Sequence, residues 1–259
     1  MKPTITVIIP TFNNSVNFYQ SISSVINQTY KVSKIVVIDD NSDDFDNLKK
    51  IINKCKLSEF KNIELIRNYK NFGPGYSRNL AWNNSSTDLI AFNDDDDIWY
   101  KTKLEEQVNI FKKFKNADMV VCKKKNYSIK KAIDSFKIFK INYLSLLFKN
   151  SIPTSCVLIN SKIKQRFLER YFAEDYFLWL SMLIEKKNCY MYDKTLCEEG
   201  NILKNNRLSS NLDKMYLNVQ KTLNMFLGKN SFLTIVILFA KINYKIKFII
   251  KKNFFKKIK

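Results

Sequence analysis

The sequence contains no histidine and only four glycines and four prolines among its 259 residues. Without an imidazole side chain, the chain cannot form a histidine-based catalytic triad or a zinc site that requires histidine. The scarcity of glycine and proline excludes collagen-like and low-complexity chains. Hydrophobic residues make up 46% of the sequence, which is enough for a buried core and excludes an intrinsically disordered chain. Any acid, base or metal ligand must therefore come from other side chains.

Long apolar segments are missing as well. The run at Thr4–Ile9 is too short for the core of a signal peptide, and Phe232–Ala240 is roughly half as long as a membrane-spanning helix. We therefore expect a cytoplasmic chain that is not exported and has no transmembrane segment. The cysteines are odd in number and contain no CxxC pair, which is typical of reduced, buried thiols. They are Cys55, Cys122, Cys156, Cys189 and Cys197.

Acidic residues are few relative to basic ones, and the imbalance lies in one part of the chain. There are 24 Asp+Glu against 44 Lys+Arg, for a formal net charge of +20. Residues 1–100 have 11 basic and 12 acidic side chains, whereas residues 101–259 have 33 and 12. Only five of the basic residues are arginine, the better partner for phosphate and guanine, so we do not expect nucleic acid to bind.

The basic C-terminal segment has a pattern of its own. Residues 229–259 contain nine lysines, no acid, and apolar residues between the lysines. This pattern predicts an amphipathic helix that binds an anionic membrane surface, which would hold the protein peripherally at the inner face of the cell membrane. The alternative is a helix that packs on the domain with a solvated lysine face.

The order of secondary-structure signals predicts an α/β fold. Strand and helix signals alternate up to residue 122, which favours a mostly parallel, Rossmann-like sheet flanked by helices. We see no repeat and no linker, so we expect one domain at residues 1–230 and a basic helical extension at 231–259. The predicted strands are Thr4–Ile9, Lys34–Ile38, Ile63–Ile66, Leu89–Phe92, Met119–Cys122, Cys156–Ile159 and a short Tyr190–Tyr192. Predicted helices in the second half include Tyr176–Ile184 and one from Leu212 to Phe226.

Three polar clusters directly follow predicted strands. They are Phe12-Asn13, Asp39-Asp40 and Asp94–Asp97. In open α/β sheets, ligands bind beyond the carboxyl ends of the strands, so we expect the clusters to converge on one site. For Asp39-Asp40, an Asx-turn or a helix cap is the alternative.

The run Asp94–Asp97 predicts a metal–diphosphate site. Four neighbouring carboxylates repel one another, and Mg²⁺ or Mn²⁺ is usually held by one or two carboxylates together with substrate phosphates. Strand alternation would place Asp94 and Asp96 on one side and Asp95 and Asp97 on the other. A solvated loop that caps the next helix is the alternative.

Over roughly residues 4–185, the chain resembles family 2 glycosyltransferases. The resemblance implies a GT-A fold, a nucleotide-sugar donor, a divalent cation and inversion at the anomeric carbon. It also implies a nucleotide-sugar and metal half at residues 1–122 and an acceptor half at 123–230. The segments that carry it, in order, are Val7–Asn13, Ser24–Tyr30, Val37–Asp43, Asn71–Gly73, Ser77–Asn79, Asp94–Trp99 and Glu174–Trp179.

The same resemblance implies roles for individual residues. Pro10 and Phe12 would flank the base of the donor, and Asp40 would accept a hydrogen bond from a uracil-type N–H. Arg78 would lie near the diphosphate.

Asp94 and Asp96 would match the Asp-x-Asp pair, with Asp94 also on the donor and Asp96 the principal ligand of Mn²⁺ or Mg²⁺. Asp175 would be the catalytic base, because a carboxylate near the sugar must take the proton of the attacking hydroxyl. Glu174 is the alternative base. Both acids also suit the first turn of a helix beginning near Tyr176.

The expected function is transfer of a hexose or N-acetylhexosamine from a UDP-sugar to a glycan or a polyprenyl-diphosphate-linked glycan. Such an enzyme would act in bacterial surface polysaccharide synthesis, for O-antigen, capsule or lipooligosaccharide. A nucleotidyltransferase is one alternative, although the sequence has no glycine-rich phosphate loop. A non-enzymatic basic module that binds membrane or nucleic acid is the other.

Overall fold

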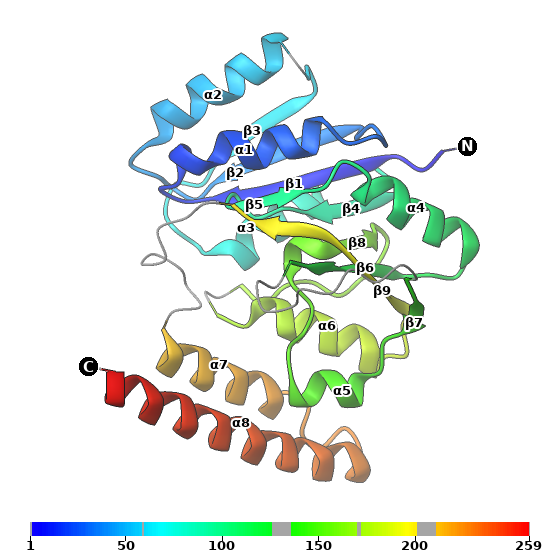
Figure 1. The fold of residues 1–259 in the computed structure, drawn as a ribbon, viewed down its shortest axis with the longest axis vertical. Helices are drawn as coiled ribbons and strands as arrows, with labels where there is room; N and C mark the ends of the chain where they lie inside the picture. The colour runs from blue at the N-terminus through cyan, green and yellow to red at the C-terminus, as the bar shows by residue number, and fades with distance from the viewer. Residues whose placement is uncertain (1, 59, 126–135, 170–171, 201–210, 259) are drawn as a thin grey trace.

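Alternating strands and helices make up the first half of the chain (Figure 1). The computed structural model describes residues 2–58, 60–125, 136–169, 172–200 and 211–258. The first strand is buried at every position, which agrees with its continuous apolar sequence. The elements of this half are β1 (Ile5–Thr11), α1 (Ser15–Ile26), β2 (Lys34–Asp39), α2 (Phe45–Ser58), β3 (Ile63–Arg67), α3 (Pro74–Asn83), β4 (Leu89–Phe92), β5 (Asp97–Trp99), α4 (Lys103–Lys113) and β6 (Met119–Lys124).

The strands form one mixed sheet in the order β3-β2-β1-β4-β8-β6-β9-β5, with β7 paired to β9. The first four strands in this order are parallel, so the carboxyl ends of β1, β2 and β4 meet at one edge. Beyond β4 the pairing is antiparallel except between β6 and β9. The predicted α/β fold is therefore confirmed, and its parallel part carries the polar clusters.

The second half adds further strands to the same sheet and places helices beneath it. Its elements are β7 (Ile138–Lys140), α5 (Tyr143–Phe148), the 3-10 turn η1 (Thr154–Cys156), β8 (Val157–Asn160), α6 (Glu174–Ile184), β9 (Cys189–Glu199), α7 (Leu212–Asn224) and α8 (Ser231–Ile258). The sequence predicted only a short strand at residues 190–192, but β9 has 11 residues. The later part of β9 is polar, and its residues form ion pairs such as that of Lys194 with Glu106. A prediction from hydropathy alone therefore missed it.

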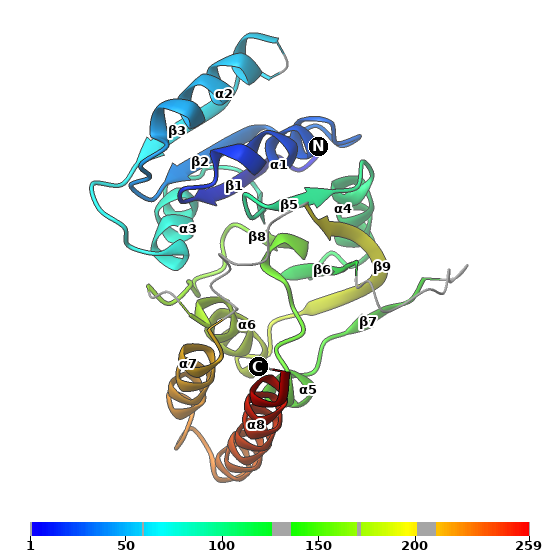
Figure 2. The same cartoon turned by 60° about the vertical axis from the view of Figure 1, so that its left-hand side comes forward.

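The C-terminal helices lie on the far side of α6 from β1–β3, as Figure 2 shows. α8 packs on α5 and α7 through the buried side chains of Leu233, Ile237 and Ala240. The predicted C-terminal helix is thus present, although Lys259 and the side chains of residues 254–258 lie outside the described part. No helix within the described ranges has both the length and the hydropathy needed to cross a membrane.

Close packing at Gly75 joins the two halves of the fold. Gly75 lies in the first turn of α3, and a Cβ atom at this position would lie 2.1 Å from the carbonyl oxygen of Leu168. The same atom would lie 3.2 Å from Cβ of Glu174, the first residue of α6. Only a residue without a side chain allows α3 to approach this segment so closely.

Candidate active site

The acidic run at residues 94–97 is a tight turn between β4 and β5. The backbone N–H of Asp97 donates to the carbonyl oxygen of Asp94 at 3.1 Å, which closes the turn. Two serines hold it from outside: the Asp94 N–H donates to Oγ of Ser155, and Oγ of Ser21 donates to the Asp94 carbonyl oxygen, both at 2.9 Å. Helix α1 and the turn η1 therefore fix the acidic loop at the carboxyl end of β4.

Three of the four aspartates point toward one another. One carboxylate oxygen each of Asp94, Asp96 and Asp97 lies within 4.8 Å of the others, whereas Asp95 accepts a hydrogen bond from Oγ1 of Thr11 at 2.6 Å. The prediction that Asp94 and Asp96 share a side, with Asp95 on the other, is confirmed. The placement of Asp97 opposite them is wrong, because the turn at residues 93–96 interrupts the strand alternation on which that prediction relied.

Asp97 is the most enclosed acid of the cluster, with 1% of its side chain exposed. Burial and the charge of Asp94 raise its pKa to about 7, although Lys124 beside it has the opposite effect. The Oδ2 atom of Asp97 is buried and accepts no hydrogen bond from the residues that the structure describes. Three converging carboxylates, one of them with an unsatisfied buried oxygen, fit a hard divalent cation such as Mn²⁺ or Mg²⁺. Asp94 and Asp96 stay the predicted ligands, with Asp97 as a third oxygen donor.

Arg78 connects the acidic turn to the second half of the chain. Its side chain is only 5% exposed, and its two terminal nitrogens bind different carboxylates. Nη2 lies 2.6 Å from Oδ1 of Asp94, and Nη1 lies 2.9 Å from Oε1 of Glu174. The planar guanidinium group is well suited to such a two-sided contact. The structure thus brings together Arg78, the acidic cluster and the acids of α6.

Glu174 and Asp175 form the first turn of α6, as the sequence predicted. Burial and the neighbouring charge of Asp175 raise the pKa of Glu174 to about 7 in spite of Arg78. Burial likewise raises the pKa of Asp175. Oδ1 of Asp175 accepts the Tyr176 N–H at 2.6 Å, and Oδ2 accepts a hydrogen bond from Nδ2 of Asn150 at 3.3 Å. Arg78 thus engages Glu174, whereas Tyr176 and Asn150 bind the carboxylate of Asp175.

Asp39 is the last residue of β2 and Asp40 follows it, and the two carboxylates contact different parts of the chain. The Asp40 carboxylate accepts hydrogen bonds from Nδ2 of Asn68 at 2.7 Å and from the backbone N–H groups of Phe72 at 3.0 Å and Gly73 at 2.7 Å. Asp39 accepts the Ser42 N–H and pairs with Arg67. A carboxylate offers about four acceptor sites, so Asp40 retains room for roughly one further donor.

Pro10 and Phe12 lie at the end of β1, next to Asp40. Pro10 is buried within β1, while the ring of Phe12 is 46% exposed just beyond it. The Asp40 N–H donates to the carbonyl oxygen of Thr11 at 2.9 Å. The polar cluster after β1 therefore lies beside the one at the end of β2. An exposed ring beside a strand-end carboxylate is able to stack on a planar base.

The sequence analysis did not single out some residues of the site. Lys124, the last residue of β6, lies 2.6 Å from Asp97, and Asn150 and Ser155 support Asp175 and Asp94. Each comes from the less regular second half or from its boundary. In the sequence, Lys124 is marked only by its position at the end of a strand, and Ser155 only by its position next to a short apolar strand.

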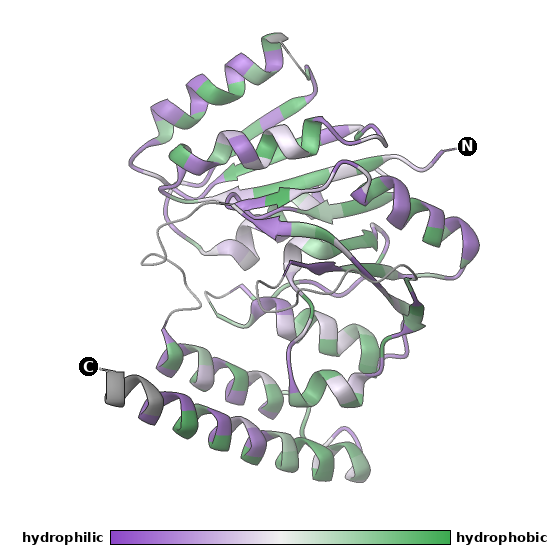
Figure 3. Ribbon diagram, in the orientation of Figure 1, coloured by the Kyte–Doolittle hydropathy of each residue, from purple (hydrophilic) through white to green (hydrophobic). Residues whose placement is uncertain are grey.

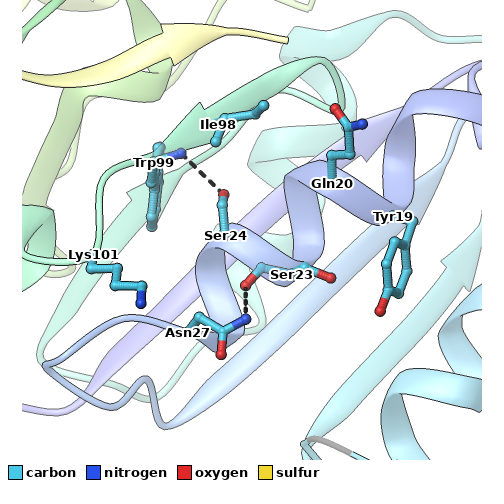
Figure 4. A pocket seen from close by; sticks show the side chains of 8 residues that line it. All are labelled: Tyr19, Gln20, Ser23, Ser24, Asn27, Ile98, Trp99 and Lys101. Atoms are coloured by element: carbon cyan, nitrogen blue, oxygen red, sulfur yellow. Dashed lines mark hydrogen bonds between the residues drawn. The ribbon is translucent and has the colours of Figure 1, made fainter. Parts of the chain in front are cut away.

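A surface hollow beside α1 contains none of the predicted site residues. It lies between α1 and β5, as Figure 4 shows, and its polar groups bind one another: the Trp99 N–H donates to Oγ of Ser24, and Nδ2 of Asn27 donates to the Ser23 carbonyl oxygen. The predicted residues gather instead at the carboxyl ends of β1, β2 and β4 and the start of α6.

Comparison with known proteins identifies the family of the chain. The family model described as "Glycosyl transferase family 2" matches residues 6–168. The chain is 32% identical over 197 residues to the UDP-Glc:alpha-D-GlcNAc-diphosphoundecaprenol beta-1,3-glucosyltransferase WfaP of Escherichia coli, covering 73% of this chain and 75% of that protein.

Two solved structures share the fold. TarS 1–349 of Staphylococcus aureus in complex with UDP-GlcNAc superposes with a TM-score of 0.73 at 19% identity, over 95% of this chain and 73% of that one. The mannosyltransferase PcManGT of Pyrobaculum calidifontis, in complex with GDP-Man and Mn²⁺, gives 0.70 at 14% identity, over 94% and 70%. At these identities the likeness shows the fold alone.

Proposed function

Since the chain belongs to glycosyl transferase family 2, we propose that it is an inverting, metal-dependent enzyme that transfers a hexose or an N-acetylhexosamine from a UDP-sugar. Its acceptor is a glycan or a polyprenyl-diphosphate-linked glycan of bacterial surface polysaccharide synthesis. The observation that carries the proposal is the Arg78 bridge between Asp94 and Glu174, because it joins an acidic cluster to a candidate base in one site. The names of WfaP and of the TarS complex support a UDP-sugar donor and a lipid-linked acceptor. Family membership speaks against the nucleotidyltransferase and the non-enzymatic module.

The donor lies along the carboxyl ends of β1, β2 and β4. Pro10 and Phe12 flank the base, and Asp40 accepts its N–H through the acceptor capacity that its three protein contacts leave. Asp94 faces the diphosphate together with Arg78. The division into a donor half at residues 1–122 and an acceptor half at 123–230 is part of this proposal.

Asp96 and Asp94 would hold the metal ion, and Asp97, whose carboxylate lies in the same cluster, would be able to join them. When bound, Mn²⁺ or Mg²⁺ acts as a Lewis acid that neutralises charge on the leaving diphosphate. The protein keeps these carboxylates in place through Ser21 and Ser155 on the acidic turn. Arg78 orients Asp94 from the other side.

The chemical step needs a base for the acceptor hydroxyl, and Asp175 takes this proton as the oxygen attacks the anomeric carbon. Asn150 and the first turn of α6 hold its carboxylate in a fixed orientation. Burial raises the pKa of Asp175 above that of a free aspartate, which makes it a stronger proton acceptor at the pH of the cell. Attack from the face opposite the departing diphosphate inverts the anomeric centre.

A donor screen tests the proposal directly. Full-length protein is incubated with UDP-, GDP- and dTDP-sugars, Mn²⁺ and a polyprenyl-diphosphate-linked N-acetylglucosamine, and the released nucleotide and the product are measured. We expect consumption of a UDP-sugar, inverted anomeric configuration by NMR, and loss of the reaction in EDTA. Use of only GDP- or dTDP-sugars, a retained configuration, or full activity in EDTA would each contradict one part of the proposal.

We also propose that α8 attaches the enzyme to the inner face of the membrane. One side of α8 packs on the domain, but the opposite side exposes a row of apolar residues, and the first half of α8 is mainly green in Figure 3. In the C-terminal segment, the lysines are the only charged residues, which favours an anionic lipid surface over a second copy of the same basic helix. The exposed apolar residues are Phe232, Ile235, Leu238, Phe239, Ile242, Ile246, Ile249 and Ile250.

Vesicle co-sedimentation tests this attachment. Full-length protein should bind vesicles that contain phosphatidylglycerol, bind pure phosphatidylcholine vesicles weakly, and be released by salt. The double substitution Phe239→Ser/Ile246→Ser removes two exposed apolar residues and should reduce binding strongly. Leu57→Ser changes a still more exposed apolar residue on α2, 87% exposed, and should not reduce binding. Equal binding by both variants would contradict the proposal.

A further inference from the structure

Three consecutive lysines at the end of β6 point in two directions. Lys123 and Lys125 lie on the surface, each 47% exposed, and pair with Asp193 and Glu198. Lys124, which lies between them, points into the site instead, and its side chain is only 21% exposed. Its ammonium group is therefore separated from those of its two neighbours and lies at the acidic cluster.

The ammonium group of Lys124 lies within the negative field of that cluster. Nζ is 2.6 Å from Oδ1 of the buried Asp97 and 3.5 Å from Oε1 of Glu199, at the end of β9. Asp97 in turn shares the three-carboxylate group with Asp94 and Asp96. The group thus has a cation at each flank, Arg78 on Asp94 and Lys124 on Asp97, and carries less net negative charge than its three acids alone.

We propose that Lys124 is a positioning residue of the metal centre: it is the counter-cation of Asp97 and weakens the binding of a divalent cation until the diphosphate of the donor is present. The inference rests on the metal-dependent transfer proposed above. A fixed positive charge a few ångströms from a divalent ion repels it, and a nucleoside diphosphate supplies the negative charge that compensates this repulsion. Metal and nucleotide would then bind cooperatively, each raising the affinity of the other by the same factor.

Manganese binding by the full-length protein without nucleotide tests the repulsion. The signal of free Mn²⁺ in electron paramagnetic resonance measures the dissociation constant without any turnover. Lys124→Met should tighten Mn²⁺ binding by about tenfold or more, because one nearby positive charge is removed. Lys124→Arg keeps the charge and should keep the wild-type affinity. Lys125→Met, the matched control on the adjacent surface position, should also leave it unchanged.

The cooperativity provides a second readout. In the wild-type protein, adding UDP should tighten Mn²⁺ binding, and in Lys124→Met this effect of UDP should be smaller. Unchanged or weaker Mn²⁺ binding in a folded Lys124→Met variant would overturn the proposal, since a lysine that only shapes Asp97 would give that result. An effect of UDP as large as in the wild-type protein would overturn it as well.

A double variant covers the case in which Lys124→Met does not fold because Asp97 is left buried without a counter-cation. Asp97→Asn/Lys124→Met removes both charges and is compared with Asp97→Asn alone. The double variant should bind Mn²⁺ about tenfold more tightly than the single one, and equal affinities would overturn the proposal. If wild-type protein binds no Mn²⁺ with or without UDP, the metal dependence of the proposed function fails, and this inference with it.

Discussion

The proposed donor half and the proposed acceptor half hold their carboxylates in different ways. Asp40, in the donor half, is bound by three hydrogen-bond donors of the protein at 2.7 to 3.0 Å. Asp175, in the acceptor half, is held by one backbone N–H and by Asn150 at 3.3 Å or more. A group that binds a ligand profits from a rigid position, whereas a group that takes a proton needs acceptor capacity that is not already used.

The residues around the two groups differ as well. The proposed donor half gathers its acids at the ends of parallel strands, where Arg78 and backbone N–H groups surround them together with Lys124 from the second half of the chain. The acceptor half places its acids in the first turn of one helix, where burial raises the pKa of both. We interpret this difference as a division of work, with binding of charge proposed for the first half and proton transfer for the second.

The largest loss is expected from Asp96→Asn in the donor half. It removes a charged oxygen ligand from the acidic cluster and should abolish transfer while the melting temperature stays close to that of the wild type. Asp95→Asn is the matched control, because Asp95 turns away from the cluster toward Thr11 and should retain turnover. Wild-type turnover of Asp96→Asn with Mn²⁺ would show that the metal assignment is wrong.

In the acceptor half, Asp175→Asn should lower the transfer rate by about 10² to 10⁴, the usual contribution of a general base. UDP binding measured by calorimetry should stay unchanged, because the residue serves the acceptor. Asp193→Asn, which alters a carboxylate outside the site, serves as the control. A loss of less than about tenfold would transfer the role of the base to Glu174 or another group.

Asp40→Ala should weaken UDP binding without changing the Mn²⁺ affinity of the free protein. The effect is expected to be about tenfold to 150-fold, because a hydrogen bond to a charged group contributes about 1.5 to 3 kcal/mol. Asn68→Ala removes one of the contacts of Asp40 and tests whether Asp40 acts only by holding residues 68–73. If Asn68→Ala weakens UDP as much as Asp40→Ala does, direct contact between Asp40 and the base is contradicted.

The smallest effect concerns pH. A base must be deprotonated to act, and the pKa of Asp175 is raised, so the rate should fall on the acid side with a midpoint above the 3.8 of a free aspartate. Glu174 and Asp175 titrate as a pair, and the midpoint belongs to both. Asn150→Ala removes a hydrogen bond that lowers the pKa of Asp175 and should shift the midpoint to higher pH. A rate that stays constant down to pH 4 would rule out this assignment.

The sequence predicted the donor half well, because a buried parallel strand is a continuous apolar run and its end is marked by the first polar residues. Asp40 and the acidic turn were found in this way. The orientation of Asp97 was not, since a turn has no fixed alternation. The partners of the site residues were also missed: Asn150 lies 25 residues from Asp175, and Lys124 contacts Asp97 across the sheet. Such contacts depend on tertiary packing and leave no local pattern.

The length of strand β9 was missed for a similar reason. Its 11 residues join β6, β7 and β5, yet its polar second part reads as a loop when taken alone. Ion pairs with neighbouring elements, such as Lys194 with Glu106, replace the apolar burial that a strand prediction relies on. The acceptor half was therefore predicted mainly where it is helical.

The glycine in the first turn of α3 sets how closely this helix approaches the start of α6, which holds the proposed base. A methyl group at residue 75 would act as a wedge against the carbonyl oxygen of Leu168, only 2.1 Å away, and would push the helix that holds Arg78 away from the helix that holds the base. Reacting atoms must meet within about 3 to 3.5 Å, and a displacement of 1 Å costs about 10² in rate. Although Gly75 has no reactive group of its own, we therefore expect that a side chain at this position would disturb the geometry in which the glycosidic bond is made.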